Sequence, residues 1–466
     1  MKPRIQRALA RQGLEITQQG SIYRVERAGS DGPAAEVLLP EGFPLEGKAL
    51  AQLARFAAVK HPAGGRVCQA CATPDFHPGS LVPVGAVVAS AELVIPQAIG
   101  TDINCGMRLH VSDITLDAFT AKTAELVSRL KGDLLLGTRD LPTSVGAMRG
   151  MFEAGGPGWL EATRGDPLGA LARSDFGQLE SELDRVYAGG HAKGRARWAP
   201  QTLLPEDRDT LRDPSLGTVG GGNHFVELQV VTDVHDGPTA WAWGVRTGQV
   251  AFMIHTGSRS VGVAIGTRWS EIARERWPKG VRWPEIFSLR GGDAEDYLEA
   301  MNTAANYATV NRLLIAELVR LRLREVFGDR DAPLVFDVPH NIVLREDDLF
   351  VHRKGATPAH EGQPVLIPGS MGHPSFLMAG CGNPRFLRSC SHGAGRAVTR
   401  FDMTRKGRPD RALGLEGVEC ITLREERMLE EAPAAYKEIG PVIDVQVEHG
   451  LVRPVATLRP LLTFKA

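Results

Sequence analysis

The sequence predicts one large domain in which strands and helices are mixed. Apolar runs broken by Gly and Pro, at 81–90 and 92–100, are typical of buried strands. Over 301–327 apolar residues recur at steps of three and four, which predicts a long helix. The length of 466 residues would by itself suggest about three domains. However, residues with distinctive chemistry are spread from Asp75 to Lys437 without a repeat or low-complexity linker, and a site drawn from so many segments favours a single composite domain.

The remaining elements follow from the same patterns. We expect a helical start and a short strand within 1–60, helices and polar loops over 115–213, a Gly-rich loop and an apolar run over 216–228, short strands at 250–254 and 333–336, and strands and loops from 352 onward. Arg320, Arg322 and Arg324 alternate with the apolar residues of the long helix. We expect these arginines on a solvated edge of that helix rather than in an RNA-binding groove.

Composition and charge exclude several classes of protein. Lys and Arg total 54 against 55 Asp and Glu, so the formal net charge is −1. This balance excludes bulk attraction to nucleic acid or to a membrane, and any site for a polyanion must be a local patch. The first twenty residues hold no apolar signal core, no window of 18 apolar residues follows, and only six cysteines are present. We therefore expect a cytoplasmic protein without a membrane partner.

Two Gly-bounded strings contain residue types that bind metals. GTDINCGM (100–107) holds Asp102 and Cys105, and a carboxylate with a thiolate is a metal-ligand combination. Taken alone, this pair is better explained by a turn aspartate and a small buried thiol. GTVGGGNHFVEL (217–228) places three glycines before His224, which allows a backbone to approach an anion or ligand closely. It lacks the Lys-Ser/Thr of a Walker A loop, and His224 read alone could also be a core histidine.

Three further histidines follow apolar runs or precede small residues. His255 and His340 each come at the end of a short predicted strand, a common position for ligands. Arg259, just after His255, suits either a phosphate or solvent. His392 precedes Gly-Ala-Gly-Arg, whose amides suit phosphate oxygens. Together these strings supply enough ligands for two metals sharing one thiolate, with His392 outside the metal shell.

Cys68 and Cys71 form a CxxC pair without a second pair nearby. A structural zinc site is therefore weakly supported, and we expect two ordinary buried thiols.

Nine strings of the chain resemble, in order, the RtcB family of RNA-splicing ligases. They are TPDFHPG (73–79), GTDINCGM, GTVGGGNHFVE, IHTGSRSVG, PHN (339–341), HRKGAT (352–357), PGSMG (368–372), SHGAGR (391–396) and AYKEI (435–439). HRKGAT and SHGAGR are highly specific. The resemblance covers about residues 65–466 and leaves 1–60 unmatched.

The resemblance implies an α+β fold: a single large domain over 1–466, with mixed sheets, a central metal cleft and residues 1–60 packed on it. It implies ligation of 2′,3′-cyclic phosphate or 3′-phosphate RNA ends to 5′-hydroxyl ends, with GTP and two Mn²⁺ ions, through a histidine–GMP intermediate. An archease-like activator is a further implied partner. By their own chemistry, one thiolate and three imidazoles also suit zinc or cobalt, so manganese comes from the resemblance alone.

Residue roles are carried over from the matching strings. The implied residues are the metal ligands Asp102, Cys105 (bridging both ions), His224, His255 and His340; the nucleophile His392, oriented by Asp75; the GTP-binding residues Asn223, Glu227, Ser370, Ser375, Gly393, Ala394, Gly395, Arg396 and Lys437; and Arg259 and Arg400, which would meet RNA phosphates. We expect Glu227 and Lys437 to select guanine, because a carboxylate accepts from N1–H and N2–H₂ while an ammonium donates to O6.

The chain departs from the family pattern at a few positions. Thr101 and Asn104 stand where Val and Gly are usual, His373-Pro374 replaces small residues, and Val398-Thr399 replaces Met-Ser. These departures leave room for a specialised paralogue with altered RNA or nucleotide choice. The alternatives are a metal-dependent RNA-end phosphoesterase that no longer ligates and a catalytically silent RNA-binding protein. The complete ligand set and His392 argue against the silent protein.

Overall fold

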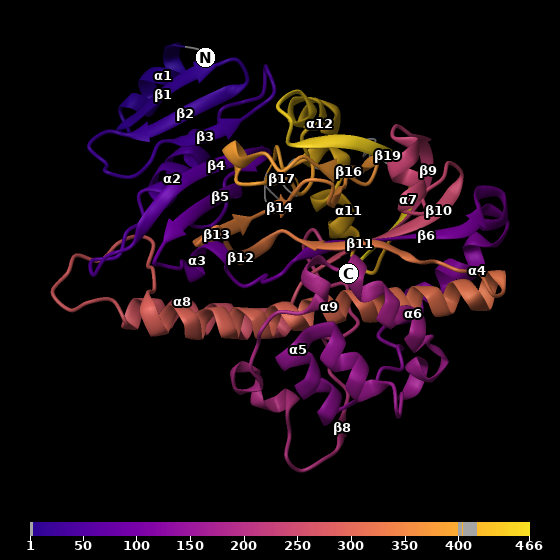
Figure 1. Cartoon of the computed structure of the whole chain (residues 1–466). Helices are drawn as coiled ribbons and strands as arrows, with labels where there is room; N and C mark the ends of the chain where they lie inside the picture. The colour runs from indigo at the N-terminus through magenta and orange to yellow at the C-terminus, as the bar shows by residue number, and fades with distance from the viewer. Residues whose placement is uncertain (1–2, 399–402, 404–416) are drawn as a thin grey trace.

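Figure 1 shows the computed structural model, which describes residues 3–398, 403 and 417–466. A seven-stranded sheet and an eight-stranded sheet lie above the long helix α9 (Gly291–Phe327) in this view, and α5 (Val145–Thr163) and α6 (Phe176–Ser181) lie below it. Both sheets contain antiparallel strands and one parallel pair. The predicted α+β class with mixed sheets is confirmed.

The seven-stranded sheet joins the N-terminal residues to segments far along the chain. Its strands, in spatial order, are β1 (Leu14–Gln19), β2 (Ile22–Arg27), β3 (Ala35–Leu38), β4 (Arg66–His77), β5 (Val84–Ala91), β13 (Leu349–Lys354) and β12 (Asn341–Glu346). β3 and β4 are parallel, and α2 (Gly47–Ala57) connects them. Leu50, Leu53 and Phe56 of α2 are fully buried in the core cluster that covers this sheet.

The eight-stranded sheet carries most of the candidate site. Its strands are β11 (Leu334–Pro339), β6 (Gly106–Thr115), β10 (Gln249–Thr256), β9 (Phe225–Val234), β19 (Val452–Lys465), β16 (Ser375–Gly380) and β15 (Pro364–Ile367), with β18 (Glu419–Thr422) pairing in parallel with β19. Two short ladders join β14 (Ala356–Pro358) to β17 (Ser389–Ser391) and β7 (Thr143–Ser144) to β8 (Thr210–Leu211).

The long helix α9 packs against the second sheet. The remaining helices are α1 (Pro3–Ala10), α3 (Pro96–Ile99), α4 (Leu116–Leu134), α5 (Val145–Thr163), α6 (Phe176–Ser181), α7 (Gly237–Ala242), α8 (Arg259–Glu275), α9 (Gly291–Phe327), α11 (Glu425–Glu430) and α12 (Ile439–Glu448), with 3-10 turns η1 (Gly169–Arg173), η2 (Glu182–Arg185), η3 (Tyr187–Gly190), η4 (Ala196–Trp198), η5 (Gln201–Leu203), η6 (Pro384–Phe386) and η7 (Pro433–Ala435). Ile315 and Val319 of α9 pack in one hydrophobic cluster with Phe252 and Ile254 of β10. The helix therefore covers one face of the strands that carry the candidate site.

Three local predictions differ from the structure. α9 begins ten residues before the predicted start at 301. Part of the strand predicted at 92–100 is the short helix α3, whose first residue is Pro96; a proline cannot donate to a strand ladder but fits the first turn of a helix. Cys71 is buried as expected, but Cys68 is exposed.

The interleaved arginines of α9 are mostly not solvated. Arg320 is 3% exposed and forms ion pairs with Glu182 and Glu317. The side chain of Arg322 is partly exposed and pairs with Asp133 at 2.7 Å. The prediction of a solvated edge is wrong for Arg320, because η2 covers that face of α9 and supplies a carboxylate. Among the described residues, no helix is both long and apolar enough to cross a membrane.

Candidate metal and nucleotide site

Four strand ends of the eight-stranded sheet meet at one edge. Cys105 directly precedes β6 and His224 directly precedes β9, whereas His255 lies at the end of β10 and His340 follows β11. In the register, His255 pairs with Met107 on one side and with Phe225 on the other, and Pro339 pairs with Gly106. Because neighbouring strands run in opposite directions, two beginnings and two endings coincide at the same edge.

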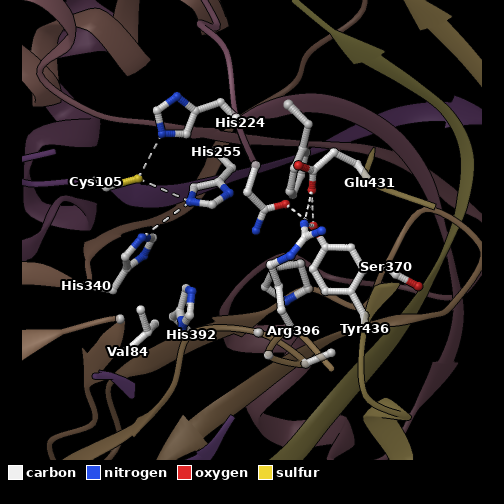
Figure 2. A pocket seen from close by; sticks show the side chains of 18 of the residues that line it. Val84, Cys105, His224, His255, His340, Ser370, His392, Arg396, Glu431 and Tyr436 are labelled. Carbon is white, nitrogen blue, oxygen red and sulfur yellow. Dashed lines mark hydrogen bonds and ion pairs between the residues drawn. The ribbon is translucent and has the colours of Figure 1, made fainter. Parts of the chain in front are cut away.

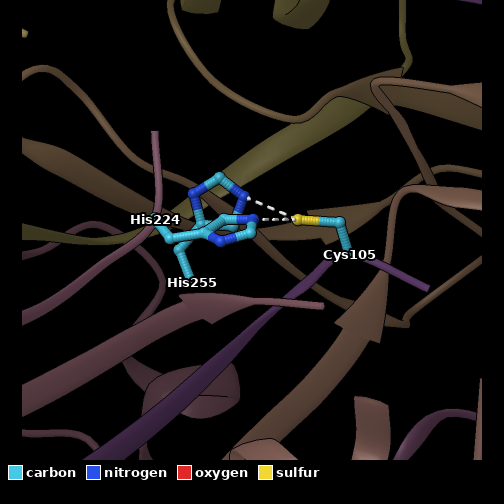
Figure 3. Close-up of side chains that lie close together, drawn as sticks. All are labelled: Cys105, His224 and His255. Atoms are coloured by element: carbon cyan, nitrogen blue, oxygen red, sulfur yellow. Dashed lines mark hydrogen bonds between the residues drawn. The ribbon is translucent and has the colours of Figure 1, made fainter. Parts of the chain in front are cut away.

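The side chains at these strand ends converge on one point. The Cys105 Sγ atom lies 3.3 Å from Nε2 of His224 and 3.2 Å from Nε2 of His255 (Figure 3). The Nε2 atoms of His255 and His340 are 3.3 Å apart (Figure 2). Asp102 completes the group, with its Oδ2 atom 3.2 Å from Nε2 of His224.

The electrostatics of this cluster suit a cation. Burial, followed by repulsion from neighbouring histidines, holds the pKa of His255 and His340 well below the usual range, so both imidazoles are neutral and have lone pairs to offer. Burial and the nearby Asp102 carboxylate raise the pKa of the Cys105 thiol. A bound divalent cation would reverse that shift, because metals bind the thiolate. The donor set therefore fits a metal.

The loop that carries Asp102 and Cys105 is tied to α9. Asn104 has φ +53°, a left-handed conformation that glycine favours and asparagine tolerates. Its Nδ2 donates to the Ala305 carbonyl at 2.6 Å and to the Thr309 hydroxyl at 3.1 Å. Arg312 donates from Nη1 to the carbonyl of Asn104 at 2.7 Å, and Asp337 holds the same guanidinium. Asn104, the departure between two predicted ligands, thus anchors the loop.

His392 lies beside the cluster and is paired with Asp75. Nδ1 of His392 is 2.6 Å from Oδ2 of Asp75, and the ring centroids of His392 and His340 are 4.7 Å apart. Asp75 is fully buried and also accepts from the Thr73 hydroxyl at 2.6 Å. Burial by itself raises the pKa of Asp75, but attraction to His392 and the two hydrogen bonds outweigh it and hold the pKa below the usual range. Asp75 is therefore an ionised acceptor, and it leaves Nε2 as the remaining nitrogen of His392.

Close backbone packing requires a glycine just after His392. Gly395 has φ +76°, and a Cβ atom at this position would lie 2.3 Å from the carbonyl oxygen of Asp75. The small residues of 393–396 therefore allow the His392 loop to lie directly against β4.

These groups line one cavity of about 430 Å³. Cys105, the three clustered histidines and His392 form one end of it (Figure 2), and Asp102 also lines it. The predicted nucleotide residues Asn223, Glu227, Ser370, Gly393, Ala394, Gly395 and Arg396 also line it. The cavity thus contains the candidate metal ligands and His392 at one end, and the rest of it has room for a nucleotide.

The sequence comparisons agree with this geometry. A family model described as tRNA-splicing ligase RtcB matches residues 52–466. The chain belongs to the RtcB family. It is 35% identical over 431 residues to the tRNA-splicing ligase RtcB of Thermococcus kodakarensis, covering 83% of this chain and 86% of that protein. Identity to the protein of the same name from Archaeoglobus fulgidus is 33% over 426 residues, covering 83% and 86%. With the Methanococcus maripaludis protein it is 31% over 436 residues, covering 84% and 87%.

Two residues expected to hold the nucleotide lie outside the cavity wall of this RtcB family member. Lys437 donates from Nζ to the carbonyl of Phe76 at 2.5 Å and approaches that of Pro74 at 3.4 Å. Lys437 therefore does not line the cavity in this structure, because its ammonium is bonded to the backbone of β4 beside Asp75, and its contact with guanine stays a prediction. Ser375 is 1% exposed and accepts from Gln229.

Lys465 takes the place in the cavity that was expected of Lys437. It lies at the end of β19, where the register pairs Thr463 with Glu227 of β9, and it lines the cavity with Glu227. Burial raises the pKa of Glu227 to about 7, although hydrogen bonds from Thr463 and Gln229 and the charge of Lys465 lower it. Lys465 sits in no recognisable motif, so only the strand pairing reveals it.

A second group missed in the sequence surrounds Arg396. This guanidinium donates to Glu431 at 2.9 Å and lies over the ring of Tyr436 at 5.1 Å. The Tyr436 hydroxyl donates to Oδ1 of Asn223 at 2.7 Å. Through these contacts Glu431 and Tyr436 position Arg396 and Asn223, two of the predicted nucleotide residues. Both also line the cavity.

Three further predicted residues are Ser370, Arg259 and Arg400. The Ser370 hydroxyl is 2.6 Å from Nδ1 of His373, so the unusual histidine contacts a cavity residue directly. Arg259 begins α8 with φ +49°, and its Nε donates to the Thr218 hydroxyl at 3.1 Å rather than lining the cavity. Arg400 lies outside the described residues.

Proposed function

We propose that this protein is an RNA ligase that joins 2′,3′-cyclic phosphate or 3′-phosphate RNA ends to 5′-hydroxyl ends, using GTP and Mn²⁺ and a His392–GMP intermediate. The observation that carries the proposal is the pair formed by His392 and the buried Asp75 beside the Cys105 cluster. Membership in a family whose curated relatives are named tRNA-splicing ligases supports the reaction class.

In this proposal the residues that would hold the metal ions are Asp102, Cys105, His224, His255 and His340, and the Cys105 thiolate would serve both ions. Once bound, the ions supply positive charge for the phosphate oxygens and help to align the leaving group. Thiolate and imidazole ligands suit zinc and cobalt too, so the choice of manganese is itself tested by comparing metals.

His392 is the nucleophile of the first step. Nδ1–H of His392 donates a hydrogen bond to the Asp75 carboxylate, which fixes the tautomer and leaves the lone pair on Nε2. Nε2 attacks the α-phosphorus of GTP, an N–P bond forms, and pyrophosphate leaves with the electrons of the broken P–O bond.

The guanylate then passes to RNA. An oxygen of the RNA 3′-phosphate attacks the same phosphorus, and the N–P bond breaks to return His392 to its starting form. The 5′-hydroxyl oxygen next attacks the activated 3′-phosphate and forms the new phosphodiester bond, its proton passes to solvent, and GMP leaves with the electrons of the broken anhydride P–O bond. A cyclic phosphate must first be hydrolysed to a 3′-phosphate, and each later step is an in-line substitution at phosphorus.

Guanine selection is assigned to Glu227 together with Lys465. The Glu227 carboxylate would accept from N1–H and N2–H₂, and the Lys465 ammonium would donate to O6. Adenine would leave both groups with unsuitable partners, and buried unpaired polar groups reject the wrong ligand strongly. The physical support is that both side chains are buried and line one cavity.

The other partners in the proposal are broken or spliced RNA, approached by Arg259 and Arg400, and an archease-like activator. A cytoplasmic location belongs to the same proposal.

The deciding experiment is incubation with α-labelled GTP and Mn²⁺, followed by denaturing electrophoresis, with and without RNA bearing a cyclic phosphate. A ligase should carry label on His392 and lengthen the RNA. His392→Ala should lose the label, whereas His235→Ala, an exposed histidine elsewhere in the chain, should keep it. If the RNA ends change but the protein carries no label, the protein is a phosphoesterase. If the protein is unlabelled and the RNA is unchanged, RNA binding is the only activity left.

A further inference from the structure

A groove far from the cavity combines aromatic rings with positive charge. It lies between the end of α2 and the loop joining α8 to α9, at the left edge of the molecule in Figure 1. We call it the Trp283 groove and define it by Arg27, Lys60, His61, Trp277, Arg282 and Trp283. None of these residues belongs to the metal and nucleotide site.

Trp283 is an exposed ring on a fixed support. Its side chain is 64% exposed, and its ring lies perpendicular to that of Phe287 with 5.5 Å between ring centroids. Trp277 packs on the same Phe287 ring and on His61, and its indole N–H donates to the carbonyl of Arg282. The loop is therefore held by the buried Trp277, while Trp283 keeps most of its surface accessible to a ligand.

The cations of the groove are only partly neutralised. Lys60 pairs with Asp31 at 2.7 Å, and Arg55 at the groove wall pairs with Glu285. Within the described part of the chain, Arg27 and Arg282 form no ion pair with an acidic side chain. The surface therefore keeps a local positive charge on a protein whose formal net charge is −1.

We infer that the Trp283 groove binds single-stranded RNA, with a base stacked on Trp283 and phosphates held by Arg27 and Arg282. Aromatic faces beside cations form the usual platform for single strands, because every base has a face to stack and every nucleotide a charge. This inference rests on the proposed function, since it assigns the groove to RNA whose end lies in the cavity.

The distance along α8 sets the length of RNA involved. α8 begins at Arg259, beside the Gly220 loop near the cavity, and ends at Glu275, two residues before Trp277. Its 17 residues span about 25 Å at 1.5 Å each. At a stacked spacing of about 3.4 Å per nucleotide, roughly seven nucleotides cover this span. Strands of five nucleotides should end short of the groove, whereas strands of 20 should reach it.

The test measures binding of fluorescent single-stranded RNAs of five and 20 nucleotides to the full chain by anisotropy. Trp283→Ala should weaken binding of the longer RNA about tenfold and leave the shorter one unchanged. Trp283→Phe should restore most of the loss. Trp241→Ala is the matched control, because Trp241 is 75% exposed on α7, outside the groove.

The charge contribution has its own readout. Replacing Arg27 and Arg282 together by Ala should make the plot of log affinity against log salt shallower by about 1.4, the value for two phosphates on a single strand. Arg246→Ala, an exposed arginine near α7, should not change the slope.

Unchanged binding of the longer RNA in both the Trp283→Ala variant and the double arginine variant overturns the inference. A change of oligomeric state in Trp283→Ala, with RNA affinity intact, assigns the groove to a second copy of the chain and also overturns it. GMP labelling of His392 and ligation of short RNAs are measured separately. If the unmodified protein shows neither GMP labelling nor ligation, the proposed function is refuted. The length dependence of RNA binding would still test the groove.

Discussion

Raising the pH from 6 to 8 should increase the preference of the cavity for GTP over ATP about tenfold. Glu227 is the titrating group, because burial raises its pKa to about 7. Only the ionised carboxylate accepts from both N1–H and N2–H₂ of guanine. With a pKa of about 7, roughly 9% of the groups are ionised at pH 6 and roughly 91% at pH 8. An apparent dissociation constant scales inversely with the competent fraction, which gives the tenfold change.

The measurement uses competition between GTP and ATP for a His392→Ala background in the presence of Mn²⁺, where nucleotide binds but no adduct forms. Titration of the phosphates and of the metal ligands affects both nucleotides equally and cancels in the ratio. Glu227→Gln keeps the size of the side chain but cannot ionise, so its ratio should not change with pH. A constant ratio in the His392→Ala background, or an equally steep rise after Glu227→Gln, would refute this role of Glu227.

The same titration should appear in the stability of the fold. The pKa of Glu227 rises from 4.5 to about 7 on folding, so the folded state holds the proton more tightly. The contribution of Glu227 to the free energy of unfolding therefore falls as the pH rises from 4.5 to 7 and is constant above that. The shift corresponds to about 3 kcal/mol. Urea unfolding should show Glu227→Gln gaining stability relative to the unmodified chain between pH 5 and pH 8.

Three further substitutions test other parts of the site. His392→Ala should carry no covalent GMP but still ligate RNA supplied with a 3′-guanylyl end, and mass spectrometry finding GMP on another residue of the unmodified protein would contradict this. Cys105→Ala should lose both metal ions, since each would lose a shared thiolate, and a full complement in elemental analysis would disprove the bridge. Asn104→Gly should lower the free energy of unfolding by about 1–2 kcal/mol, because two hydrogen bonds to α9 are lost. Metal content should be retained, and unchanged denaturation midpoints would show that the anchor contributes nothing.

The sequence could predict that Cys105, His224, His255 and His340 come together, because each lies at a strand end in a recognisable string. The sequence did not reveal which strands pair or in which register. Lys465 enters the cavity only because β19 pairs with β9, and it stands 238 positions after Glu227 in the chain. Lys437 lies in a matching string but points to the back of β4, since a string fixes a backbone position and leaves the direction of a long side chain open.

The burial of charged side chains was the other feature that the spacing of residues in the sequence could not predict. Arg320 has the spacing of a surface residue, yet Glu182 from a distant 3-10 turn covers it. Pairing of β1–β3 with the rest of their sheet depends on contacts across the chain in the same way. The extent of the domain over 1–466 and the roles of the individual site residues stay predictions.

The alignment of four strand ends has a consequence for how a bound ion would leave. Cys105, His224, His255 and His340 are fixed by ladders that join β11, β6, β10 and β9. The four side chains come from four different segments, so movement of one loop leaves the others in place, and full release requires rearrangement at several strand ends. Ion exchange should then be slow, and a bound ion would stabilise the folded state by joining the ends of four paired strands.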